Sequence, residues 1–72
     1  MEPKFGDIWK HTKRGSTYEI IGIGRMRCAD SAKDMQRCVV YISTANTTEL
    51  WIRPVEEFLE IVDSVPRFSK IK

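Results

Sequence analysis

The chain is organised around the stretch Thr17–Arg25, a run of β-branched and aromatic residues whose apolar positions are divided between the two faces of a strand. Such residues favour β-strands, and Gly15, just ahead of them, suits a hairpin turn. Alternation divides this strand into two faces, one with Tyr18, Ile20, Gly22 and Gly24 and the other with Glu19, Ile21 and Ile23. Two glycines on one face predict a strand that bends sharply or passes close to another backbone. We therefore expect this strand to coil at Gly22 and Gly24 and to serve both halves of a small sheet.

The same kind of pattern predicts three further strands, at Asp7–Lys13, Arg37–Ser43 and Glu49–Arg53. Pro54 lacks an N–H and ends the last of them, but it is well placed to begin a helical turn. The segment Phe58–Val62 fits either a continued helix or a strand, and we expect a short turn followed by extended chain. These elements predict a mainly β protein, a small SH3-like open barrel of four or five strands with one short helical turn after Pro54.

The length of 72 residues predicts one domain with a thin core. We place that core at about residues 6–63 and expect residues 64–72 to form a basic tail, with Phe68 as its one anchor. The net charge of +2, from 12 basic and 10 acidic residues, is too balanced to indicate nucleic acid by bulk charge alone. No stretch approaches the length of a membrane span, and a cytoplasmic protein with no membrane contact is the expectation.

Cys28 and Cys38 are the only cysteines, and their spacing matches no common metal motif. Together with His11 they offer at most three soft ligands, whereas structural zinc sites take four. We expect two reduced thiols, with a cross-strand disulfide as the alternative if the protein is exported, and we expect no metal and no cofactor.

Aromatic and basic residues form the best candidate site. Stacking rings and phosphate-pairing cations together suit a single-stranded nucleic acid or a nucleotide. The candidate ligand-binding residues are Trp9, His11, Lys13, Arg14, Tyr41, Trp51 and Arg53. Trp51 and Arg53 share a face of one strand, and Arg25 is expected near Lys13 and Arg14 at the mouth of the first hairpin. The structural alternative is that the rings pack in the barrel wall and that Arg53 pairs with a nearby glutamate.

Enzymatic interpretations find little support in the sequence. A trio of Ser16, His11 and Asp7 can be drawn, but no nucleophile elbow, P-loop or zinc-protease spacing accompanies it. Gly22–Gly24 lacks the third glycine of a dinucleotide fingerprint and is assigned a structural role. We expect no catalytic residues.

Three strings of the sequence resemble a known family when they are taken together. They are HTKRGSTYEIIG from His11, VVY from Val39 and WIRPVEEF from Trp51. They resemble the family called domain of unknown function 1653, which is found in bacteria and phages. The resemblance implies a small β-rich domain and no agreed activity. The chain departs from the family pattern in the loop Ala29–Gln36 and at Ile42, where an arginine often follows the tyrosine.

Two hypotheses for function are favoured by these observations, ahead of a third, a small hydrolase or isomerase with His11 as its general base. The first is a non-catalytic binding module, a phage or bacterial accessory protein that binds another protein or associates with itself through an open face or sheet edge. The alternative is a module that binds a phosphate-containing ligand, either single-stranded nucleic acid or a nucleotide signal that it sequesters.

Overall fold

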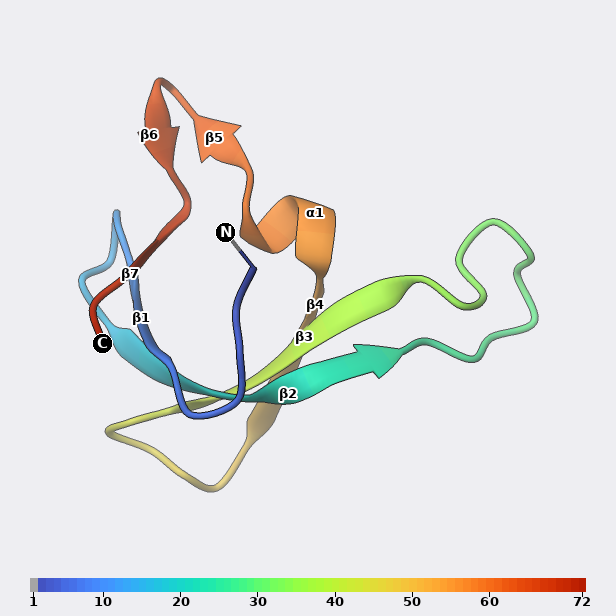
Figure 1. Ribbon diagram of the computed structural model, residues 1–72, viewed down its shortest axis with the longest axis horizontal. Coiled ribbons are helices and arrows are strands. Elements are labelled where there is room, and N and C mark those ends of the chain that lie inside the picture. Colours follow the sequence, from blue (N-terminus) through green and yellow to red (C-terminus); the bar gives the residue numbers. More distant parts are fainter. Residues whose placement is uncertain (1) are drawn as a thin grey trace.

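The computed structural model describes residues 2–72, which form one five-stranded antiparallel sheet and a small separate hairpin (Figure 1). In chain order the elements are β1 (Ile8–His11), β2 (Thr17–Arg25), β3 (Arg37–Ser43), β4 (Leu50–Pro54), α1 (Val55–Phe58), β5 (Ile61–Val62), β6 (Val65–Pro66) and β7 (Phe68–Lys70). The strand order in the sheet is β4-β3-β2-β1-β7, and β5 pairs with β6. The sheet curves without closing, so the predicted open, mainly β architecture is confirmed, as is the helical turn after Pro54.

A bulge in β2 explains why its apolar residues looked divided between two faces. Ile20 lies opposite Tyr41 of β3, whereas Gly22 lies opposite the adjacent Val40, which makes Ile21 the extra residue of β2. A bulge bends its strand and moves every later residue to the other face. Ile23 therefore packs against the core on the same side as Ile20, and our assignment of faces beyond the bulge was wrong. The predicted bend is confirmed.

The core lies on one face of the sheet, beneath α1 (Figure 1). Its buried members are Trp9, Ile20, Val39, Tyr41, Phe58 and Phe68. Phe58 of α1 stacks flat on Phe68 of β7, with ring centroids 4.1 Å apart and planes inclined by 6°. The single helical turn thus places one aromatic ring at the centre of the molecule.

The C-terminal residues, expected as a tail, belong to the sheet. Phe68–Lys70 pair with β1, and Phe68 lies opposite His11 with only 3% of its surface exposed. The helix ends at Phe58 and Ile61–Val62 are extended, as expected for a short turn followed by extended chain. The chain reaches β7 through the β5–β6 turn, where Asp63 and Ser64 adopt positive φ angles. Across residues 2–72, no helix has the length and apolar character needed to cross a membrane.

Candidate functional site

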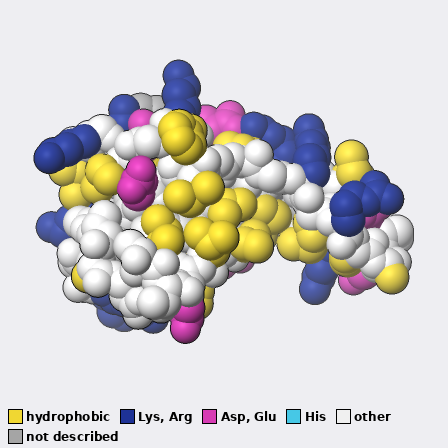
Figure 2. Space-filling model, turned by 90° about the horizontal axis from the view of Figure 1, so that it is seen from below, with side chains coloured by type: hydrophobic (Ala, Val, Ile, Leu, Met, Phe, Trp, Pro, Cys, Tyr) yellow, Lys and Arg dark blue, Asp and Glu magenta, His cyan; other side chains and the backbone are white. Residues whose placement is uncertain are grey.

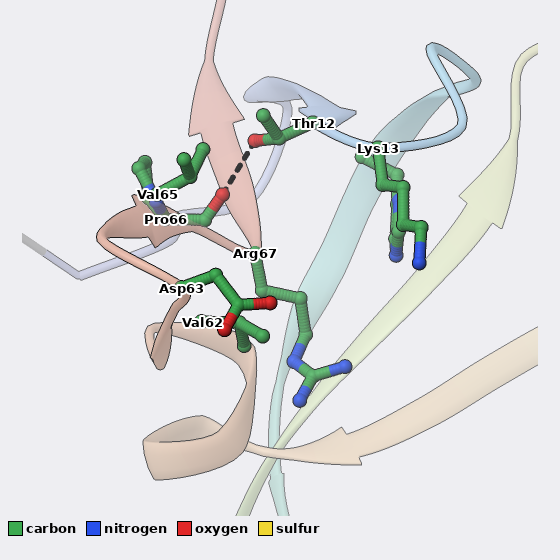
Figure 3. A pocket seen from close by; sticks show the side chains of 8 residues that line it. Thr12, Lys13, Val62, Asp63, Val65, Pro66 and Arg67 are labelled. Atoms are coloured by element: carbon green, nitrogen blue, oxygen red, sulfur yellow. Dashed lines mark hydrogen bonds between the residues drawn. The ribbon is translucent and has the colours of Figure 1, made fainter.

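A pocket of about 410 Å³ opens where the end of β1 meets the β5–β6 hairpin. It is lined by His11, Thr12, Lys13, Val62, Asp63, Val65, Pro66 and Arg67 (Figure 3). Thr12 holds its two walls together, because its hydroxyl donates to the carbonyl of Pro66 (2.5 Å) and its amide donates to the carbonyl of Arg67 (3.0 Å). The pocket therefore joins segments that lie more than fifty residues apart in the sequence.

Four cationic side chains lie near enough to His11 to act on its charge. Its Nδ1 accepts a hydrogen bond from the amide of Arg14 (3.2 Å), and its ring meets Phe68 edge-on, with centroids 5.0 Å apart. Burial lowers the pKa of His11 below its ordinary value of 6.5, and the charges of Arg14, Arg53, Arg67 and Lys13 lower it further. The lowered pKa favours the neutral imidazole, and Nδ1 is its hydrogen-bond acceptor. We call His11 and these four cations the basic cluster.

Arg53 reaches the basic cluster from β4 and is held in place on three sides. Its Nε donates to the hydroxyl of Tyr41 (3.3 Å), and its Nη1 pairs with Glu57 of α1 (2.9 Å). Its guanidinium also lies 5.7 Å from the ring centre of Phe68, within cation–π range. The expected pairing of Arg53 with a nearby glutamate is confirmed, and Tyr41 positions this arginine from within the core.

Arg67, which was expected to lie in the C-terminal tail, is a member of the basic cluster. Its Nη2 pairs with Glu60 (2.5 Å), while its Nε is shielded from solvent and has no hydrogen-bond partner within residues 2–72. Figure 3 shows its guanidinium beside the pocket, on the side that faces Lys13. The only feature of the sequence that pointed to Arg67 was its position next to the aromatic Phe68.

The structure divides the other candidates into three groups. Lys13 lines the pocket and Arg14 occupies the turn beside it. Trp9 is buried, edge-on to Phe58, with Nε1 donating to Asp7 (3.3 Å), so its ring is closed to ligands. Trp51 is 49% exposed on the same face of β4 as Arg53 and flanks the site without lining the pocket.

The expectation that Arg25 lies near the hairpin mouth was wrong. It lies at the far end of β2, opposite Arg37, and its guanidinium donates to the carbonyl of Met35. β2 extends well beyond β1, so this end of the strand is remote from the Arg14–Ser16 turn.

The cluster can hold an anion beside an apolar surface. Three carboxylates, on Glu57, Glu60 and Asp63, partly balance the four cations and leave an excess of positive charge. Val62, Val65 and Pro66 supply an exposed apolar wall. Within residues 2–72, no group of three or more His, Cys, Asp or Glu side chains is arranged to hold a metal ion. Cys28 and Cys38 are both free thiols, the first half-buried and the second buried.

Comparison with known proteins gives one match. Residues 7–70 match the family described as "Protein of unknown function (DUF1653)", a span that includes every strand and the whole pocket. No curated protein and no solved structure matches the chain.

Proposed function

We propose that this chain, which belongs to the DUF1653 family of proteins of unknown function, is a non-catalytic binding module for a ligand that combines a phosphate group with a planar ring. Single-stranded nucleic acid and free nucleotides have this chemistry. One observation carries the proposal: four cations from three separate segments converge on a half-buried histidine beside an apolar-walled pocket.

The cations retain donors for a ligand. A guanidinium has five N–H donors, and Arg53 and Arg67 each give only part of this set to protein acceptors. Within residues 2–72, Lys13 and Arg14 have no ion pair with a carboxylate. A phosphate oxygen arriving between these groups would gain charge-assisted hydrogen bonds without first breaking an ion pair of Lys13 or Arg14.

The apolar parts of the site suit a ring. Val62 and Val65 are 41% and 43% exposed although they are hydrophobic, and together with Pro66 they form one wall of the pocket. Trp51 offers an exposed aromatic face on the Arg53 side. Base–aromatic stacking contributes about 1–3 kcal/mol per base in proteins that bind single strands.

Binding is favoured over catalysis by the environment of the three candidate catalytic groups. His11 uses Nδ1 to accept a backbone amide, so this nitrogen is not available as a base. The hydroxyl of Ser16 bonds with that of Tyr18 (3.0 Å). Asp7 accepts from the amide of Lys4 (2.9 Å) and from Trp9, and these bonds, chiefly the one from Lys4, lower its pKa. These groups do not form a catalytic relay.

The two free thiols favour a reducing compartment, and we propose that the protein is cytoplasmic.

The test is a titration of the ¹⁵N-labelled protein with a short thymidine oligonucleotide, with adenosine monophosphate and with inorganic phosphate, each at two salt concentrations. We expect amide shifts at His11–Gly15, Arg53 and Val62–Phe68, and binding that weakens with salt. Shifts with all three ligands would indicate a phosphate site, and shifts with the oligonucleotide alone would indicate a strand-binding groove. The absence of shifts in these segments with any ligand would refute the proposal.

Two charge-matched variants make the test specific. Arg67→Gln removes a cation from the cluster, whereas Arg27→Gln removes one from the loop after β2, where its side chain is 76% exposed. We expect Arg67→Gln to weaken oligonucleotide binding about tenfold and to lower the slope of log K against log salt by about 0.7, the single-strand value for one phosphate contact. Arg27→Gln should change neither. Equal effects of the two substitutions would show that net charge, and not the pocket, controls binding.

A further inference from the structure

The strand β4 forms an edge of the sheet, and Pro54 at its end is its one proline. In the part of the chain that the structure describes, it pairs with β3 alone. Its residues Leu50, Trp51 and Ile52 are three consecutive hydrophobic residues, with 58%, 49% and 65% of their surfaces exposed. Natural edge strands are usually kept from pairing with other chains by lysines, prolines, bulges or very short length. The opposite edge, β7, follows this rule, because it has three residues and ends at Lys70.

The hydrophobic edge continues onto the outer face of the sheet, which α1 and the β5–β6 hairpin leave uncovered. In the register of the sheet, Leu50 lies beside Ile42, and Ile52 lies beside Val40, all on the side opposite the core. Next to Val40 is Gly22, which has no side chain to interrupt this surface. Figure 2 shows hydrophobic side chains gathered in the middle of this face.

We propose that β4 pairs antiparallel with β4 of a second copy of the chain, about a two-fold axis that passes through Trp51. This register sets Glu49 opposite Arg53 of the second copy, and Leu50 opposite its Ile52, with each pair formed twice. Opposite charges and apolar side chains directly across an antiparallel pair stabilise it. Within residues 2–72, Glu49 has no ion pair, so its carboxylate is available for this contact.

Other registers of this β4–β4 pairing give less favourable contacts between the two strands. A shift of one residue would set Trp51, on the core side, opposite Ile52, on the outer side, and would mismatch the two faces. A shift of two residues would set Pro54 opposite Leu50, where proline has no N–H to donate, and would separate Glu49 from Arg53. The register centred on Trp51 leaves Pro54 beyond the paired segment.

The resulting dimer has one continuous sheet with both basic clusters on the same face, because the two-fold axis is perpendicular to the sheet. The inference goes beyond the proposed function, since it concerns the edge of β4 and needs no ligand, although Trp51 and Arg53 lie at both the edge and the candidate ligand site. The dimer also accounts for the exposure of the hydrophobic β4 residues, which the small core of a single copy leaves uncovered.

The experiment is sedimentation equilibrium of the full chain, without ligand, across a wide range of concentration. We expect the wild-type protein to approach twice its monomer mass of 8.4 kDa. Ile52→Lys, on the edge, should weaken the dimer at least about tenfold. The matched control is Ile61→Lys in β5, where the side chain is equally exposed at 63%, and it should leave the dimer intact.

A second variant keeps the proposal testable if Ile52→Lys fails to fold, as judged by circular dichroism. Glu49→Arg places two like charges opposite each other in the proposed register and should weaken the dimer most at low salt. A wild-type monomer at all concentrations would overturn the inference, as would a dimer that loses as much affinity through Ile61→Lys as through Ile52→Lys. A dimer insensitive to both Ile52→Lys and Glu49→Arg would use another surface and would also overturn it.

Discussion

Phe58 is the largest fully buried side chain in residues 2–72. Its side chain is fully buried, stacked on Phe68 at 4.1 Å and edge-on to Trp9 (5.3 Å) and Tyr41 (5.5 Å). Removing a buried phenylalanine to alanine costs about 3–5 kcal/mol. At the usual free energy per residue, a chain of this length is stabilised by roughly 4–11 kcal/mol in total. Phe58→Ala should therefore remove about a quarter or more of the free energy of unfolding.

Urea unfolding, followed by the fluorescence of Trp9 and by circular dichroism, measures this loss. Phe58→Leu, which retains most of the volume, should cost less than about 1.5 kcal/mol. Phe5→Ala is the matched control at an aromatic position that is 78% exposed, and it should change stability by less than about 0.5 kcal/mol. A folded Phe58→Ala protein that loses less than about 1 kcal/mol would refute the assignment of this ring to the centre of the core.

Two further predictions concern the basic cluster. Tyr41→Phe removes the hydroxyl that accepts a hydrogen bond from Nε of Arg53. It should lower the free energy of unfolding by about 0.5–1.5 kcal/mol in urea titrations, and it should weaken ligand binding. Unchanged stability and affinity would show that this hydrogen bond contributes to neither. The pKa of His11 is lower in the folded than in the unfolded chain, so the unfolded chain binds the proton more tightly. Its contribution to stability should be complete above the ordinary pKa of 6.5 and should be lost as the pH falls below 6.5 toward the folded pKa. His11→Asn, which can still accept a hydrogen bond from the amide of Arg14, should remove this part of the pH dependence of the urea midpoint. A variant that keeps the wild-type pH profile would contradict the assignment of this pH dependence to His11.

Local signals were sufficient to predict most of the strands. The bounds of Thr17–Arg25 and Arg37–Ser43 match the structure, because β-branched runs bounded by turn residues depend on nearby sequence only. Gly15 adopts a positive φ of 77° in the turn before β2, and Pro54 precedes the helical turn, as their backbone chemistry requires.

What the sequence did not predict depends on contacts between distant segments. The face of Ile23 is set by the bulge, and the bulge is defined only by the register against β3. Phe68 and Arg67 enter the sheet and the basic cluster because β7 pairs with β1, nearly sixty residues earlier in the chain.

The two tryptophans show the same limit at the candidate site. Both lie in strands with a cation two residues away or closer, yet Trp9 is 4% exposed and Trp51 is 49% exposed. The difference is that β1 is an inner strand and β4 an edge strand, and strand order is a property of the whole fold. Of the seven candidate residues, His11 and Lys13 line the pocket, Arg14 and Arg53 act on the charge of His11, Trp51 is exposed beside Arg53, and Trp9 and Tyr41 are buried in the core.

The most direct test of the proposed binding site is the pKa of His11, measured from its ring proton by NMR with and without a saturating thymidine oligonucleotide. In the free protein, burial and the four cations should hold this pKa below 6.5. A phosphate bound in the cluster would offset the positive field and stabilise the imidazolium, so we expect the pKa of His11 to rise when the ligand binds. An oligonucleotide that binds and leaves the pKa of His11 unchanged would contradict the account, since its phosphates would then lie elsewhere.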